Sequence, residues 1–86
     1  MGLTGVKKIY PLFFKTRGGI HTFGMLSPID VVILDKHNRV VKLKQSLPPK
    51  RIYIWSPRYS KVLELPAGTV EKHNIKKGEI VSFKEK

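Results

Sequence analysis

The sequence predicts a mainly β fold, either a small antiparallel sandwich or an open barrel, with one short helix from Thr69 to His73. Short apolar segments alternate with turns that contain glycine or proline, and helix-forming residues gather in one place only. Regular strand spacing of this kind is typical of small all-β proteins. The 86 residues suit a single domain over residues 1–86 with one thin core.

The N-terminal part of the chain is expected to contain two strands. The first, over residues 9–14, contains Pro11, which lacks an N–H donor and therefore suits an edge strand or a bulge. A turn follows at residues 16–19. Residues 20–25 then alternate in side-chain type as a strand does, and Gly24 within them indicates a bulge or a close backbone approach.

The middle of the chain predicts a hairpin of two longer strands. The β-branched run Ile29–Leu34 is expected to be buried on both faces or nearly so. A polar loop follows, in which Asp35 can accept backbone hydrogen bonds and Asn38 can adopt a left-handed conformation. Val40–Leu47 returns as the partner strand and ends at two prolines. Its apolar and polar side chains are expected on opposite faces, with Val41, Leu43 and Leu47 against Lys42, Lys44 and Ser46.

The C-terminal part predicts three further short strands, at Ile52–Ile54, at residues 61–65 and at residues 80–83. The helix lies between the last two. Asn74 suits a left-handed helix end, and Ile75 just beyond it can fold back onto the helix. Six or seven strands and one helix are therefore expected in all.

The charge of the chain is strongly positive. Seventeen lysines and arginines face six acidic residues, for a formal net charge of +11. Such a field attracts polyanions, including nucleic acids. The basic residues are spread along the chain without a block of five, so a solubility role is the simpler alternative.

Cysteine is absent, which excludes disulfides, thiolate metal sites and cysteine nucleophiles. Small secreted domains more often carry disulfides, so we expect a cytoplasmic protein. The longest apolar run, residues 31–34, is far shorter than the roughly 20 residues that a membrane span needs. We therefore expect no membrane association.

Two segments of the chain carry a combination of motifs. Residues 21–35 read HTFGMLSPIDVVILD, and residues 62–78 read VLELPAGTVEKHNIKKG. Together they resemble the prokaryotic domain-of-unknown-function family 192, in which a His-x-Phe-Trp-Met strand leads to Pro-Leu-Asp and a Leu-Glu-Leu-Pro-Ala-Gly turn precedes a helix. The matching positions are His21, Phe23, Met25, Pro28, Asp30, Leu34, Asp35, Leu63, Glu64, Leu65, Pro66, Ala67, Gly68 and Gly78.

The chain departs from the family pattern in three places. Gly24 replaces a tryptophan, Ile29 replaces a leucine, and the loop before Pro28 is shorter. Family members also usually carry a further strand and helix before the position of Gly2. The resemblance implies a jelly-roll-like sandwich with a short helix and an open sheet edge, and it implies no activity, since the family has no established one. Because open edges need cover, we expect a homodimer as the partner arrangement.

A first candidate site is a cleft formed by His21, Met25 and Asp30. If their strands are neighbours, the His21 imidazole could donate to the Asp30 carboxylate, which would fix the tautomer that a general base needs. The alternative is structural, with Asp30 capping a turn and His21 a half-buried strand residue. We favour the structural alternative.

The start of the helix is a possible anion site, and the three histidines are possible metal ligands. Gly68 and Thr69 occupy the N-cap positions of the helix, where backbone N–H groups could hold an anion or simply cap the helix. The three histidines lie on different elements without the spacing of metal ligands, so neither a metal nor a cofactor is expected.

The segment of residues 50–61, KRIYIWSPRYSK, is the third candidate. Alternation places Arg51, Tyr53 and Trp55 on one face and Ile52 and Ile54 on the other. Rings flanked by cations suit single-stranded nucleic acid or another polyanion, but the rings could equally pack under a loop or form a protein interface. The candidate face comprises Lys50, Arg51, Tyr53, Trp55, Arg58, Tyr59 and Lys61.

These observations favour an uncharacterised small basic β domain that acts as a non-catalytic binding or accessory module. Polyanion binding through the 50–61 face is one alternative. A small-ligand or catalytic cleft near His21 and Asp30 is the other. An enzymatic role is the less favoured of these classes.

Overall fold

The structure is a computed structural model that describes residues 11–83. Within these residues, six strands and one short helix make up the regular structure, which confirms the predicted mainly β class. The helix ends at Lys72 with His73 as its C-cap. In chain order the elements are β1 (Leu12–Lys15), β2 (Gly19–His21), β3 (Ile29–Leu34), β4 (Val40–Leu47), β5 (Ile52–Ile54), β6 (Lys61–Pro66) and α2 (Thr69–Lys72).

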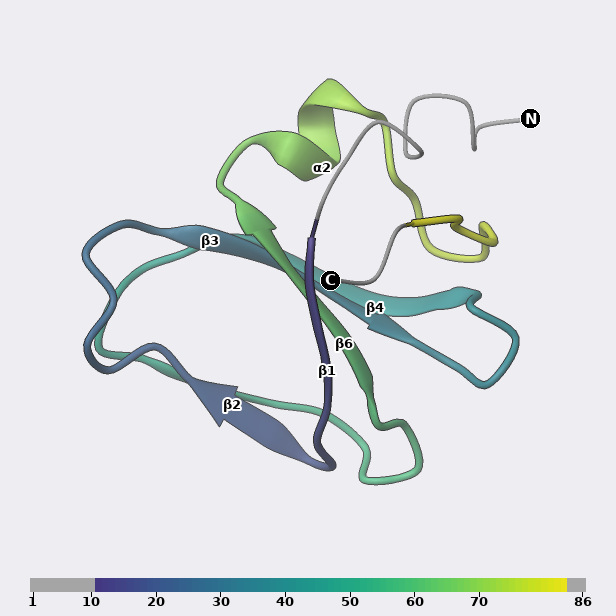
Figure 1. Cartoon of the computed structure of the whole chain (residues 1–86), viewed down its shortest axis with the longest axis horizontal. Helices are drawn as coiled ribbons and strands as arrows, with labels where there is room; N and C mark the ends of the chain where they lie inside the picture. Colours follow the sequence, from purple (N-terminus) through teal and green to yellow (C-terminus); the bar gives the residue numbers. More distant parts are fainter. Residues whose placement is uncertain (1–10, 84–86) are drawn as a thin grey trace.

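The strands form two antiparallel sheets (Figure 1). The larger sheet has the strand order β1-β6-β3-β4, and the smaller one pairs β2 with β5. The smaller sheet covers one face of the larger sheet, and α2 with the segment that follows it covers the other. The central strand β3 pairs with β4 on one side and with β6 on the other.

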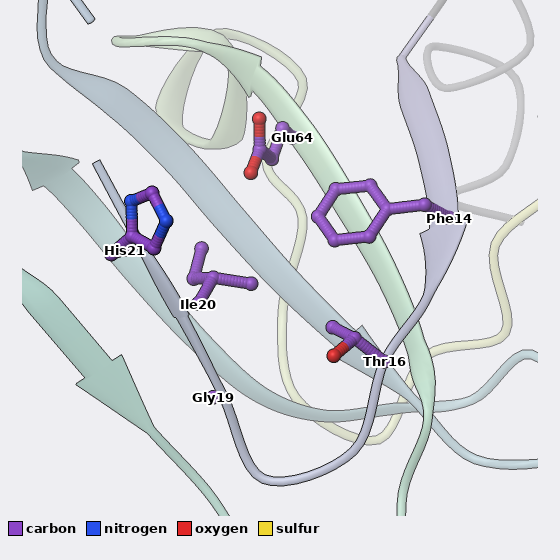
Figure 2. A pocket seen from close by; sticks show the side chains of 6 residues that line it. All are labelled: Phe14, Thr16, Gly19, Ile20, His21 and Glu64. Atoms are coloured by element: carbon purple, nitrogen blue, oxygen red, sulfur yellow. The ribbon is translucent and has the colours of Figure 1, made fainter. Parts of the chain in front are cut away.

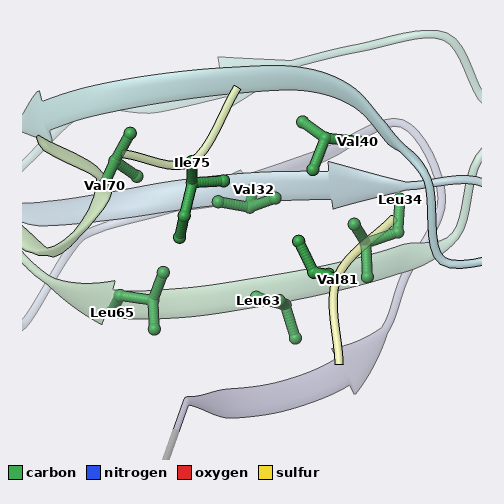
Figure 3. Packing of buried hydrophobic residues seen from close by; sticks show 8 residues of the cluster. All are labelled: Val32, Leu34, Val40, Leu63, Leu65, Val70, Ile75 and Val81. Atoms are coloured by element: carbon green, nitrogen blue, oxygen red, sulfur yellow. The ribbon is translucent and has the colours of Figure 1, made fainter. Parts of the chain in front are cut away.

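Side chains on the two faces of the larger sheet form two apolar cores. Because alternate residues of a strand point to opposite faces, β3 sends Val32 and Leu34 to the α2 side and Val31 and Ile33 to the other. The expectation of one thin core is therefore wrong, while the burial of β3 on both faces is confirmed. The α2-side core contains Val32, Leu34, Val40, Leu63, Leu65, Val70, Ile75 and Val81 (Figure 3). The β2–β5-side core contains Val31, Ile33, Leu47, Trp55 and Val62.

The pairing of β3 with β4 contains two register shifts. An extra residue in one strand shifts the alternation of every residue beyond it. Leu43 therefore packs against the α2-side core, whereas Leu47 belongs to the β2–β5-side core and Val41 packs against it. The predicted single apolar face of β4 is wrong for this reason.

The polar loop between β3 and β4 has the predicted construction. The Asp35 carboxylate accepts hydrogen bonds from the backbone N–H groups of His37 and Arg39, at 2.8 and 2.9 Å. Asn38 adopts a positive φ of 64°. The turn therefore depends on the residue types that predicted it.

Strand β2 ends at His21, earlier than predicted. The next residue, Thr22, is fully buried, and its hydroxyl donates to the Pro48 carbonyl at 2.7 Å and accepts from the Arg51 N–H at 2.8 Å. Beyond it the chain turns, with Gly24 at a φ of 89°. The predicted strand over residues 20–25 is therefore wrong beyond His21.

The predicted terminal strands also differ from the structure. Residues 9 and 10 of the first predicted strand lie outside the described residues. At the other end, only an isolated bridge joins Ile80 to Arg39, so the predicted strand over residues 80–83 is wrong. Core packing of Val81 and one hydrogen bond from its N–H to the Asn38 carbonyl, at 2.9 Å, hold this segment instead.

Candidate ligand cleft between β2 and β6

Asp30 lies on the α2 side of the larger sheet. It shares this face with Val32 and Leu34, and its side chain is fully buried. One carboxylate oxygen accepts from the Ser46 N–H at 2.9 Å, and the other accepts from the Val70 N–H at 2.8 Å. Asp30 therefore has a structural role, but it stabilises two distant backbone segments instead of capping a nearby turn.

His21 lies in the smaller sheet, on the opposite side of β3. β2 pairs only with β5 in this sheet, so the larger sheet separates His21 from Asp30. The exposed imidazole accepts a hydrogen bond at Nδ1 from the Phe23 N–H at 3.2 Å and stacks on the Phe23 ring with 5.0 Å between centroids. The predicted pairing of His21 with Asp30 is therefore wrong, and Met25 does not line the cleft at His21.

The carboxylate that does lie near His21 is Glu64 on β6. An open cleft of about 370 Å³ lies between β2 and the larger sheet, and Figure 2 shows the side chains of Phe14, His21 and Glu64 around it. These residues come from β1, β2 and β6. The full lining is Phe14, Thr16, Gly19, Ile20, His21 and Glu64.

The electrostatics of this cleft centre on Glu64. The side chain is half-buried, and burial raises the pKa of its carboxyl above the ordinary value of 4.5, because desolvation disfavours the charged form. Within residues 11–83 no hydrogen bond or ion pair reaches the carboxylate. At the rim, the hydrogen bond to Nδ1 of His21 leaves Nε2 to carry the proton of the neutral ring.

Sequence reasoning missed Glu64 as a site residue. It appeared only as one letter of the Leu-Glu-Leu-Pro-Ala-Gly motif. The available signal was the alternation along β6, which places Val62 and Glu64 on one face and Leu63 and Leu65 on the other. A single carboxylate among three apolar core positions would have identified the residue.

The 50–61 segment has the predicted alternation, and its rings face the core. Trp55 is only 7% exposed, and its indole N–H donates to the Tyr59 carbonyl at 2.8 Å. Tyr53 is half-buried against the same core, with the Lys42 ammonium 5.1 Å from its ring centroid. The outward residues are Ile52 and Ile54. Of the three alternatives, the exposed stacking face is therefore wrong, and the rings pack inward.

The basic residues of the segment are dispersed. Lys50, Arg51 and Arg58 are exposed. Lys61 instead reaches the β3–β4 loop, where its ammonium donates to Asn38 Oδ1 at 2.9 Å. No continuous ladder of cations and rings results, because the rings turn inward and the cations lie on separate turns.

The start of α2 already has a carboxylate. Gly68 has a φ of 95° and provides no side-chain cap, and the Thr69 hydroxyl donates to the Pro66 carbonyl at 2.6 Å. The Val70 N–H is bound by Asp30. The anion at this helix start is therefore one of the chain's own side chains.

The part of the chain that the structure describes contains neither a candidate metal site nor a candidate membrane-spanning helix. No group of three or more His, Asp or Glu side chains within residues 11–83 could hold a metal ion. No helix in the same range has the length and apolar character needed to cross a membrane.

Comparison with known proteins gives several related sequences. A UPF0127 protein of Thermococcus gammatolerans is 34% identical over 77 residues, which cover 87% of this chain and 48% of that protein. A UPF0127 protein of Pyrococcus horikoshii is 43% identical over 63 residues, which cover 73% of this chain and 54% of that protein. The chain thus spans about half the length of the curated relatives it matches.

The fold is similar to the crystal structure of a protein of unknown function from Novosphingobium aromaticivorans. The TM-score is 0.69 at 18% sequence identity, covering 79% of this chain and 53% of that chain. This likeness supports the fold alone. The sequence pattern of the uncharacterised family DUF192, described as "Uncharacterized ACR, COG1430", matches residues 1–83. With this match and the two relatives, the chain belongs to the DUF192 (UPF0127) family.

Proposed function

We propose that this chain is a non-catalytic binding module that holds a small ligand in the cleft between β2 and β6. The observation that carries the proposal is the half-buried Glu64 carboxyl, whose pKa is raised by burial and whose oxygens have no partner within residues 11–83. A desolvated acceptor that faces an open cleft gains most from a ligand that donates to it.

The lining indicates the chemistry of the ligand. Phe14 and Ile20 provide apolar walls, and Glu64 provides an acceptor between them and His21. A ring or short alkyl group that carries a primary amine matches this set, because the ammonium can donate to Glu64 while the body packs on Phe14. The volume of about 370 Å³ lies near the lower end of small-molecule sites, so the ligand is small.

The positive net charge of the chain does not oppose an amine at short range. At physiological salt the Debye length is about 8 Å, so most of the surface lysines are screened from the cleft. The direct interaction with Glu64 is much closer and partly desolvated. The local carboxylate therefore dominates over the distant positive charges.

The arrangement of the two titratable side chains of the cleft, His21 and Glu64, favours binding over catalysis. Within residues 11–83, His21 and Glu64 are not hydrogen-bonded to each other, and the imidazole bond goes to the Phe23 backbone. A general base needs hydrogen-bond contact with the group that it activates. The cleft provides recognition groups without that contact.

The test is a titration of the ¹⁵N-labelled protein with benzylamine, followed by NMR. We expect saturable shifts at residues 14–21 and 64, and Glu64→Gln should weaken the affinity by about tenfold or more, because it removes a charge-assisted hydrogen bond. The matched control is Glu71→Gln on the exposed face of α2. Absence of saturable shifts, or equal affinity of Glu64→Gln and wild type, would refute the proposal.

A further inference from the structure

A second cavity, of about 290 Å³, lies between the β3–β4 loop and the loop that joins β5 to β6. It is lined by Asp35, Lys36, His37, Arg58 and Tyr59. None of these residues lines the cleft at Glu64. The cavity is therefore a separate candidate site.

The first of the two loops is held in one shape by its own hydrogen bonds. Asp35 accepts from the His37 and Arg39 backbone N–H groups. The Lys61 ammonium, from β6, donates to the Lys36 carbonyl at 3.4 Å and to Asn38 Oδ1 at 2.9 Å. These contacts fix the backbone that carries Lys36 and His37.

The second loop is fixed just as closely. The Trp55 indole donates to the Tyr59 carbonyl at 2.8 Å, and the Tyr59 N–H donates to the Ser56 carbonyl at 3.1 Å. Arg17 donates from its guanidinium to the Pro57 carbonyl at 2.9 Å. Preorganised loops lose little conformational entropy when they bind a ligand.

The side chains that these loops present are mainly cationic. Lys36, His37 and Arg58 are exposed, and within residues 11–83 no hydrogen bond or ion pair occupies the Lys36 ammonium, the His37 ring or the Arg58 guanidinium. Asp35 is the single acidic residue of the lining. One of its oxygens is already directed at two backbone N–H groups, which turns that part of the carboxylate toward its own loop.

We propose that this loop cavity binds a small phosphate monoester. Arg58 matches the phosphate as a planar fork of donors, and Lys36 adds a second positive charge. The His37 imidazole supplies a third donor, and Tyr59 lies beside the organic group of the ester. A phosphate monoester is preferred over a carboxylate because it carries close to two negative charges for the two permanent cations.

The small size of the cavity favours a small phosphate monoester over an extended nucleic acid. A volume of about 290 Å³ is at the lower limit of small-molecule pockets. Successive nucleotides also require a series of exposed rings, and Trp55 is buried. The cavity therefore accommodates one phosphorylated group rather than a strand.

The test is a titration of the ¹⁵N-labelled protein with phenyl phosphate at low salt. We expect saturable NMR shifts confined to residues 35–39 and 56–60. Arg58→Gln should weaken binding by about tenfold or more. Arg51→Gln is the matched control, because it removes the same charge from an exposed position on another part of the surface.

The outcomes distinguish specific binding in the loop cavity from general attraction of an anion to the basic surface. Shifts that rise linearly and involve basic residues over the whole chain would overturn the proposal, as would equal weakening by Arg58→Gln and Arg51→Gln. So would tighter binding of a single-stranded oligonucleotide in competition with phenyl phosphate, since that result favours an extended surface. Glu64→Gln should leave the phenyl phosphate affinity unchanged, which keeps this test independent of the amine cleft.

Discussion

The Asp30 carboxylate on the central strand binds the backbone N–H of Val70 at the start of α2, at 2.8 Å. Its second oxygen binds the Ser46 N–H, where β4 departs from regular pairing and Ser46 adopts a φ of 54°. One buried side chain thus satisfies two backbone donors from separate segments. This contact links β3, β4 and α2 across the α2-side core.

Asp30→Ala is expected to destabilise the fold by about 2 to 4 kcal/mol, because it leaves two backbone N–H groups without a buried acceptor. Urea unfolding of the variant and the wild type measures this loss. Asp35→Ala is the control, since Asp35 also accepts from two N–H groups but lies in an exposed loop where water can replace it. Similar losses in both variants would show that burial of Asp30 is not the cause.

Trp55 is expected to report a buried environment in solution. It is the single tryptophan of the chain, so all indole emission comes from it, and iodide should quench this emission far less than that of free indole. Trp55→Phe should cost about 1.5 to 3 kcal/mol, through the lost hydrogen bond and the reduced volume. Tyr59→Phe should retain the indole hydrogen bond because the acceptor is a backbone carbonyl. Efficient quenching of the wild type would contradict the inward orientation.

The sequence predicted those features that depend on neighbouring residues. The β-branched run of β3, the Asp35 loop and the left-handed Asn38 all follow from local residue types. The orientation of β5 could not be obtained in this way, because alternation defines two faces without showing which one meets the core. The sequence left both orientations open, and packing of Trp55 against residues of β3 and β6 decides between them.

The candidate site was less accessible to sequence reasoning. Asp30 and His21 are close in sequence, yet Asp30 faces the α2 side of the larger sheet and His21 belongs to the smaller sheet on its other side. Glu64 and His21 line the same cleft although β6 and β2 belong to different sheets, which is a long-range consequence of the fold. Such relations depend on topology, which the local pattern does not specify.

Glu64→Gln is expected to raise the stability of the protein at pH 7. Since burial raises the folded pKa of Glu64 above its ordinary value of 4.5, the folded state binds more protons than the unfolded state just above pH 4.5. Stability therefore falls as the pH rises through this window, and the loss persists at higher pH. The gain in the variant should be less than about 1 kcal/mol, because solvent screens a half-buried carboxylate.

Urea unfolding at pH 4 and pH 7 tests this sign. The difference in the free energy of unfolding between Glu64→Gln and wild type should be larger at pH 7. Glu71→Gln should differ little from wild type at either pH. A variant that is less stable than wild type at pH 7 would mean that a favourable charge partner holds the Glu64 carboxylate. A more stable variant that has lost benzylamine affinity would show that the binding defect does not come from unfolding.

Two isoleucines provide a matched test of the two-sided arrangement around β5. Ile52 is 68% exposed on the outer face of the smaller sheet, whereas Ile33 is fully buried in the β2–β5-side core. Replacement by threonine keeps the β-branched shape that strands favour and changes mainly the polarity. Ile52→Thr should alter the free energy of unfolding by less than about 0.5 kcal/mol.

Ile33→Thr should cost about 2 to 4 kcal/mol, because it loses apolar contacts and buries a hydroxyl group. The comparison requires only urea unfolding curves of the two variants and the wild type. A large loss of unfolding free energy in Ile52→Thr would show that the outer face of β5 is covered in solution. Unfolding that depends on protein concentration would then identify a second copy of the chain as the cover. Near-neutral behaviour of Ile52→Thr together with a large loss in Ile33→Thr is the result that the inward packing of Tyr53 and Trp55 requires.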